Sequence, residues 1–269
     1  MTRSRSPAPP IGRTGRWLRG LTGLAVAVAI SQLLAVTGAV PREFLPTAAD
    51  VLTRSVRLGG DPEFLLNVAV TVRAWATGVA LAVAVGVPLG LLLGSVPALG
   101  VAVRPVLEFL RPIPSVALIP LVSLVLGAGL TTEITLVVYA SVWPVLFNAL
   151  YGLQGVDPVP RETLRVFGFS RPAVLWRVSL PAAAPFIATG VRLAAAIGLI
   201  LAVGTEILAG FGDGLGVVIA QAQQAPDGTL DVLAGLVWAG GLGLFSNAVL
   251  AGGERRLFHW HVDQAGDGR

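Results

Sequence analysis

The sequence predicts an all-α protein: a polytopic bundle of about six transmembrane helices. Of the 269 residues, 54% are hydrophobic and only 13% are charged, whereas a soluble domain of this size carries nearer a quarter charged residues. Six stretches also contain the roughly 20 apolar residues that are needed to cross a hydrocarbon core about 30 Å thick. Composition and segment length therefore agree on a membrane protein.

The six predicted spans differ little in composition, and an even number of spans puts both termini on the same side of the membrane. They cover residues 21–40, 74–103, 112–132, 134–156, 178–205 and 232–253. Only the fifth contains a charge, Arg192. Arginines precede the first stretch, as in a secretory signal, but its apolar run exceeds the 7–15 residues usual for a signal peptide, which favours an uncleaved helix.

The domain organisation that follows is simple. A basic tail (1–20) precedes the six-span domain (21–253), whose core region is 61–255, and a second tail (254–269) follows it. The first outer loop contains a candidate surface helix at 48–56. The last outer loop, at 210–231, is rich in Gly, Gln and Asp, and its glycines at 210, 212, 214 and 216 predict a flexible loop rather than a nucleotide cradle.

The placement of arginine predicts the orientation. On one side lie five arginines of the first tail, Arg104, four arginines between 157 and 181, and three of the last tail. Because cytoplasmic loops are enriched in basic residues, we expect both termini and the 157–181 segment on the cytoplasmic side. The membrane we expect is the inner membrane of a bacterium. The same rule explains the net charge of +4 without a nucleic-acid partner.

Several enzyme classes are excluded by composition. The chain has no cysteine, and all 19 basic residues are arginine, so it has no thiolate chemistry and no Walker A lysine. The two histidines, His259 and His261, lie in the last tail, where a solvated tail is the preferred interpretation over a metal pair. The sequence also lacks the G-x-S-x-G and H-E-x-x-H patterns. We therefore expect no catalytic residue, no metal and no cofactor in this chain, and any ATP hydrolysis on another polypeptide.

The segment 157–181 predicts two short helices joined at an angle. Asp157 is a good N-cap, and the first helix can run to Phe167, where Gly168 supplies the residue that ends it. Ser170 then caps a second helix, which ends at Pro181 as the fifth span begins. A loop that only sets topology needs charge but not two capped helices.

This segment also carries three aromatic residues, Phe167, Phe169 and Trp176, among its arginines. Aromatic and arginine side chains are the usual anchors of protein interfaces. The alternative is an ordinary positive-inside loop, but the capped helices favour a docking surface for a cytoplasmic partner.

Within the predicted spans, four residues are candidates for a translocation path. Arg111 opens the string RPIP, and its prolines, including Pro114, break the helical hydrogen-bond ladder; non-helical backbone at membrane depth has to be covered by protein or line a cavity. The alternative for Arg111 is a side chain that extends to the interface. Arg192 and Glu206 are 14 residues, or about 21 Å, apart along one helix. They cannot pair with each other, so each is a path or gating candidate.

At this point the sequence resembles a known family. Permeases of ABC importers carry the pattern E-A-A, three residues, G, nine residues, I-x-L-P. Here ETL at 162–164 is followed by Gly168 and by VSLP at 178–181, at the same spacings. The strings LRPIP (110–114), LIPL (118–121), PAAAPFI (181–187), TGVRL (189–193) and ERRL (254–257) resemble the sulfonate/nitrate/taurine branch. The resemblance covers roughly residues 65–260.

The resemblance implies a type I importer fold and a set of partners. These are a second permease copy or paralogue, two cytoplasmic ABC ATPases that hold ATP and Mg²⁺, an extracytoplasmic solute-binding protein, and membrane lipid. It implies that Glu162, Arg165, Phe167, Gly168 and Phe169 form the coupling helix and its approach.

By the same resemblance, Leu180 and Pro181 anchor the second helix to the fifth span. The substrate implied is a small anion such as a sulfonate, taurine or nitrate. Three alternatives are an importer for a pyrimidine- or vitamin-like precursor, a self-contained secondary transporter or channel, and an intramembrane enzyme.

Overall fold

The computed structural model describes residues 13–258 except 38–40, 42–43, 211 and 227; of helix α1 the side chains at 13–21, 24 and 27 are also outside the description. The described part is helical, with no β-strand among the described residues, which confirms the all-α prediction. Its elements are α1 (Arg13–Val36), α2 (Ala48–Leu58), α3 (Pro62–Ser95), α4 (Pro97–Leu110), the 3₁₀ turn η1 (Ser115–Leu118), α5 (Ile119–Leu126), α6 (Leu130–Gln154), α7 (Pro158–Val166), α8 (Arg171–Val174), the π-helical turn η2 (Leu175–Ser179), α9 (Leu180–Ala209), α10 (Leu215–Gln224) and α11 (Thr229–Leu257).

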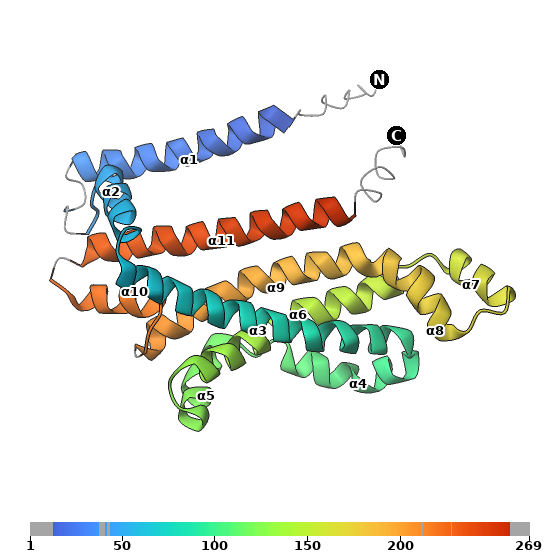
Figure 1. Ribbon diagram of the computed structural model, residues 1–269. Coiled ribbons are helices and arrows are strands. Elements are labelled where there is room, and N and C mark those ends of the chain that lie inside the picture. Colours follow the sequence, from blue (N-terminus) through green and yellow to red (C-terminus); the bar gives the residue numbers. More distant parts are fainter. Residues whose placement is uncertain (1–12, 38–40, 42–43, 211, 227, 259–269) are drawn as a thin grey trace, which may run out of the picture.

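Three long helices, α3, α6 and α9, form the core of the bundle (Figure 1). Glycines allow α3 to approach α6 closely. A Cβ atom on Gly78 would lie 2.5 Å from Val137 Cγ1, and one on Gly90 would lie 2.6 Å from Ala149 Cβ. In lipid, where apolar surface alone does not drive helices together, such close backbone packing is a main source of association.

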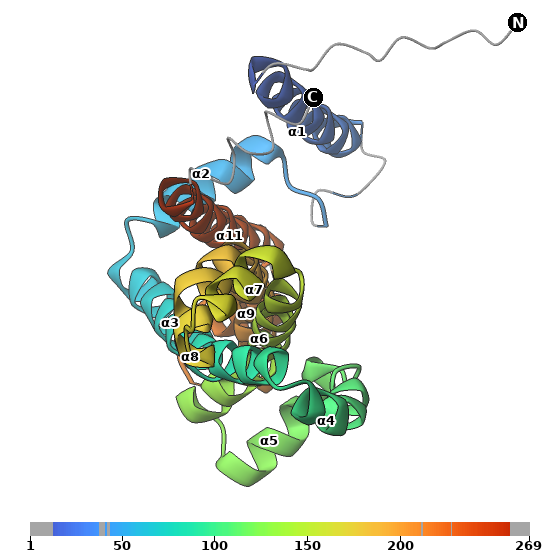
Figure 2. The same ribbon diagram turned by 90° about the vertical axis from the view of Figure 1, so that its right-hand side faces the viewer.

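Four of the described helices are long and apolar enough to cross a membrane: α3, α6, the continuous stretch 171–209, and α11. A bent pair, α4 with η1 and α5, makes a possible fifth and turns by 75°. The predicted first span overlaps α1, which lies beside α2 and apart from the three core helices (Figures 1 and 2). A total of six spans remains a prediction.

The predicted second and third spans do not match the helices. The second, 74–103, is wrong at both ends, because α3 starts at Pro62 and ends at Ser95, and Pro97 begins a new helix. The third, 112–132, is not one straight helix: the backbone breaks at 111–114, where two prolines remove amide donors, and α5 then runs only from Ile119 to Leu126. Ile119 is buried, but most of α5 is exposed on this chain.

The predicted surface helix near 48–56 is confirmed as α2, which Thr47 caps by accepting the Asp50 N–H at 3.2 Å. It packs on α11, where Trp238 Nε1 donates to the carbonyl of Ser55 at 2.9 Å. Arg54 forms an ion pair with Asp231 of α11.

The predicted outer loop at 210–231 is not a loop throughout. It contains α10, whose Leu215, Val217 and Ile219 are buried. This apolar face packs against α9 and α11.

The two ends of the bundle differ. The α7–α8 segment and the last turns of α11 lie at one end, and α2 and α10 lie at the other (Figure 1). The predicted orientation would place the α7–α8 end in the cytoplasm.

Candidate functional site

The two ends of α7 are built as the sequence predicts, whereas Ser170 precedes α8 without a side-chain capping hydrogen bond. Asp157 accepts the N–H of Val159 at 2.9 Å, and a proline occupies the first turn of α7. The helix ends in a Schellman turn, in which Gly168 N–H donates to Arg165 O at 3.0 Å and Phe169 N–H donates to Leu164 O at 3.1 Å. Gly168 has φ +82°, a left-handed conformation that glycine adopts without cost and other residues rarely adopt.

The tip of this segment exposes apolar side chains. Val166 is 86% exposed and Phe167 is 76% exposed, and Trp176 is also exposed. Phe169 lies under the guanidinium of Arg177, with Cζ 5.0 Å from the ring centroid. Figure 2, which looks at this end of the molecule, shows α7 and α8 in front of the bundle. An apolar and basic tip is thus free to meet a partner.

The second short helix does not stop at Pro181. It continues through η2 into α9, so α8 and α9 form one stretch with a π-helical turn between them (Figure 1). Val178 packs against the buried cluster of Leu153, Val156 and Ala183, which joins α6 to α9. Any movement of α8 is therefore applied directly to the core helices.

The predicted coupling residues all lie on this segment. Glu162, Arg165 and Phe167 are exposed on α7 and at its end, Leu180 is half-buried, and Pro181 is exposed in the first turn of α9.

Arg111 lies at the break between α4 and η1 and borders a cavity of ≈ 520 Å³ between η1, α6 and α9. Its guanidinium stacks on Phe147, with Cζ 4.7 Å from the ring centroid. The buried indole N–H of Trp143 borders the same cavity and has no hydrogen-bond acceptor among the described residues. Pro114 is exposed and precedes η1.

Arg192 is placed differently. Its Nη1 lies 3.4 Å from Glu254 Oε2 on α11, so an ion pair neutralises it. It does not line the Arg111 cavity; its neighbour Leu193 does. The sequence reasoning missed Glu254 as the partner, although the ERRL string that contains it was noted.

Glu206 is 4% exposed and lies one turn before the end of α9. Its Oε1 accepts the hydroxyl of Thr71 at 2.7 Å, and its Oε2 accepts the N–H of Gly216 at 2.6 Å. The carboxylate therefore caps the start of α10. A Cβ on Gly214 would collide with this carboxyl group, which explains one glycine of the 210–216 run.

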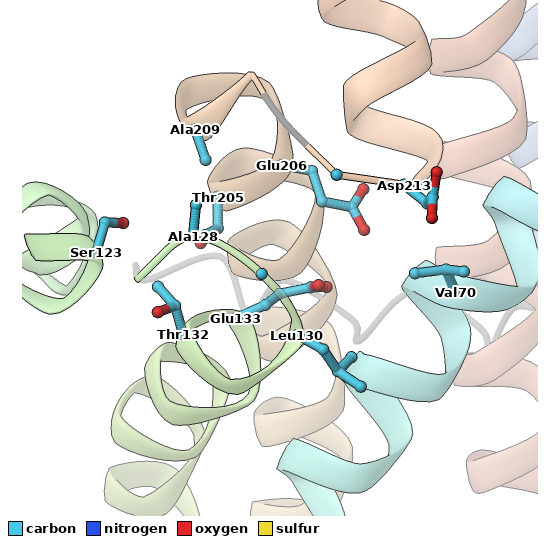
Figure 3. A pocket seen from close by; sticks show the side chains of 12 residues that line it. Val70, Ser123, Ala128, Leu130, Thr132, Glu133, Thr205, Glu206, Ala209 and Asp213 are labelled. Carbon is cyan, nitrogen blue, oxygen red and sulfur yellow. The ribbon is translucent and has the colours of Figure 1, made fainter. Parts of the chain in front are cut away.

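A second buried glutamate, Glu133 of α6, faces the same region and was missed by the sequence reasoning. Both glutamates line a cavity of ≈ 220 Å³ that is also bordered by Ser123, Thr205 and Asp213 (Figure 3). The available signal was that Glu133 is the sole acidic residue between 112 and 156.

The four predicted path residues are thus not brought together. Arg111 and Pro114 lie near one cavity, Arg192 pairs with α11, and Glu206 lies at the end of α9 beside α10. The histidines 259 and 261 fall outside the described residues.

Comparisons with known proteins agree with this geometry. Residues 86–258 match the model of the family "binding-protein-dependent transport system inner membrane component". The chain is 30% identical to the taurine transport system permease protein TauC of Escherichia coli (strain K12), over 88% of each chain. It is also 30% identical to a putative aliphatic sulfonates transport permease protein, SsuC, of Bacillus subtilis (strain 168), over 93% of this chain and 90% of that one.

Among solved structures, an inward-facing MetNI methionine ABC transporter is similar, with a TM-score of 0.60 at 18% identity. The match covers 72% of this chain and 95% of that one. The likeness confirms the predicted type I importer fold.

Proposed function

The chain belongs to the family of binding-protein-dependent transport system inner membrane components, and from this membership we propose that it is the permease subunit of an ABC importer for a small anion. In this proposal, two partner ATPases bind ATP and Mg²⁺ in the cytoplasm and dock on the α7–α8 segment. A second permease copy or paralogue completes the path, and an extracytoplasmic binding protein delivers the substrate.

The observation that carries the proposal is the exposed tip of the α7–α8 segment. A soluble surface does not gain by exposing Val166, Phe167 and Trp176 on one short segment, and exposed apolar side chains of this kind favour burial against another protein. Because α8 continues into α9, a partner that binds this tip and moves it also moves a core helix of the bundle.

The test is coexpression with an ABC ATPase that is encoded by a neighbouring gene, followed by measurement of both copurification and ATP-dependent uptake. Phe167→Ala is expected to weaken ATPase binding and uptake together, because truncating an interface anchor typically costs about 1–4 kcal/mol. Leu52→Ala, which truncates an exposed apolar residue on α2 at the opposite end, is the matched control and should leave both unchanged. Undiminished coupling in Phe167→Ala would contradict the docking site.

The choice of an anion is supported by Arg111. It faces a cavity and has no carboxylate partner among the described residues, whereas Arg192 is already neutralised by Glu254. The relatives named for taurine and aliphatic sulfonates transport point to the same substrate class.

Uptake assays with sulfonates, taurine and nitrate test this assignment. Arg111→Gln is expected to reduce uptake of the preferred anion, and Arg111→Lys to retain more of it because the charge is kept. Arg73→Gln removes an exposed arginine of α3 and serves as the control. Equal uptake in Arg111→Gln and the wild type would remove Arg111 from the path.

A further inference from the structure

Glu206 is held by hydrogen bonds at both carboxylate oxygens. Each oxygen already accepts a hydrogen bond, one from the Thr71 hydroxyl and one from the Gly216 amide. The amide lies in the first turn of α10, where the positive end of a helix dipole favours a negative charge. These contacts stabilise Glu206 as the ionised member of the pair.

Glu133 lacks such hydrogen bonds among the described residues. It is 5% exposed, and its Oε1 has no hydrogen-bond partner among the described residues. Its carboxyl group nevertheless borders the same cavity as that of Glu206, and Figure 3 shows both groups directed into the same space. Two adjacent buried carboxylates cannot both stay ionised without a compensating positive charge.

A second observation points to a ligand in this cavity. The hydroxyl of Thr205, a residue that is 3% exposed, borders the cavity without a hydrogen-bond partner among the described residues, as does the hydroxyl of Ser123. Buried polar atoms are almost always paired in native proteins. Unpaired oxygens from α5, α6 and α9 around one cavity indicate that it holds a species that the described residues do not supply.

The described residues around the cavity supply no compensating positive charge. The residues that border the cavity come from α3, α5, α6, α9 and the loop before α10, and none of them is basic. The third titratable residue among them, Asp213 of that loop, is itself acidic and exposed. The compensating charge therefore has to come from solution.

We propose that Glu133 and Glu206 form a binding site for one monovalent cation, a proton or an alkali metal ion, that holds α10 against α9. As a proton, the cation resides on Glu133, whose O–H then donates to Glu206. As a metal ion, it lies in the cavity that Glu133 and Thr205 border, where water supplies its remaining ligands. One positive charge is sufficient because the Thr71 hydroxyl and the Gly216 amide already stabilise the Glu206 carboxylate, which leaves Glu133 as the uncompensated group. The site does not depend on the proposed transport function.

Thermal unfolding of the purified full chain in detergent tests this. One series varies the pH at fixed salt; the other replaces choline by Na⁺ or K⁺ at constant ionic strength and mildly alkaline pH. If the ligand is a proton, the wild-type melting temperature falls by about 2–4 °C or more as the pH rises and the proton leaves. If it is an alkali ion, the melting temperature rises with Na⁺ or K⁺ instead.

Glu133→Gln distinguishes this site from other titrating groups. The amide can donate to Glu206 without a charge, so the variant should fold and lose the response seen in the wild type. Glu63→Gln, a change at an exposed glutamate of α3 at the same end of the bundle, should keep it. A wild type that responds to neither pH nor alkali ions, or a Glu133→Gln variant that responds as the wild type does, overturns the proposal.

A spectroscopic readout covers the case in which Glu133→Gln does not fold. The infrared carbonyl stretch of a protonated buried carboxylic acid should be visible in the wild type and in Glu63→Gln if the ligand is a proton. Absence of this band together with absence of an alkali-ion effect on the wild type also overturns the proposal.

Discussion

Replacement of Gly168 tests the docking turn at a single backbone angle. Its φ of +82° is left-handed, and a Cβ atom placed on it would meet no atom within 4 Å. Gly168→Ala therefore adds no steric clash and acts through the backbone alone. A left-handed conformation costs a non-glycine residue about 1–2 kcal/mol, which corresponds to a factor of about 5–30 in the population of the turn.

The expected consequence is a graded loss of ATPase binding. Gly168→Ala should weaken the apparent affinity of the permease for its ATPase by up to about 5–30-fold. Gly168→Asn should weaken it less, because asparagine tolerates the left-handed region better. Titration of the purified ATPase against the permease in nanodiscs measures this. Gly252→Ala is the control, because Gly252 lies in α11 with no atom within 4 Å of a Cβ.

The outcome that would refute the reasoning is specific. If Gly168→Ala and Gly168→Asn bind the ATPase as the wild type does, the Schellman turn does not set the docking geometry. If Gly168→Ala instead lowers the melting temperature of the permease alone by a large amount, the turn supports the fold rather than the partner.

Three further predictions concern the bundle and are read from melting temperatures in detergent. Gly90→Ala should lower the free energy of unfolding by about 1–3 kcal/mol through overpacking. Gly240→Ala, with open space around its Cβ, should leave that free energy unchanged or raise it by up to about 1 kcal/mol through helix propensity. Equal effects of the two changes would contradict the close packing of α3. A double-mutant cycle on Arg192 and Glu254 should give a coupling of up to about 1 kcal/mol, as for a partly exposed ion pair, and zero coupling would mean the pair contributes nothing. Thr71→Val should lower the free energy of unfolding by about 1–3 kcal/mol, because the buried Leu215 N–H loses its acceptor, the Thr71 hydroxyl at 2.8 Å. An unchanged melting temperature would show that α10 does not depend on this bond.

Local signals in the sequence were sufficient for some features. The two ends of α7 and the start of α8 could be predicted because Asp157, Gly168 and Ser170 act within a few residues. The predicted end of the second helix at Pro181 was wrong, because η2 joins α8 to α9 without a break. Helix α2 followed from the same kind of signal. The all-α class followed from composition.

Features that depend on contacts between distant residues could not be predicted in this way. The end of α3 at Ser95 and the bend after α4 interrupt an apolar run that looks continuous, and only prolines mark them. Helix α10 is short and follows a glycine-rich stretch. It is stabilised by side chains of α3 and α9 that lie far away in sequence. The partnership of Glu133 with Glu206 joins two helices and has no local signature.

One continuous stretch joins the two functional regions of this chain. Residues 171–209 form α8, η2 and α9, with the exposed docking tip just before their start and Glu206 one turn before their end. The 30 residues of α9 alone span about 45 Å. The π-helical turn at 175–179 is the place along this stretch where the backbone departs from α-helical geometry, and such turns are frequent at functional sites. A movement of α9 as a rigid unit would include the end of the helix that carries Glu206. Since Glu206 holds the first turn of α10 by a hydrogen bond to Gly216, that movement has to carry α10 with it or break the bond. The proposed Glu133–Glu206 cation site thus lies at the opposite end of this stretch from the proposed docking tip.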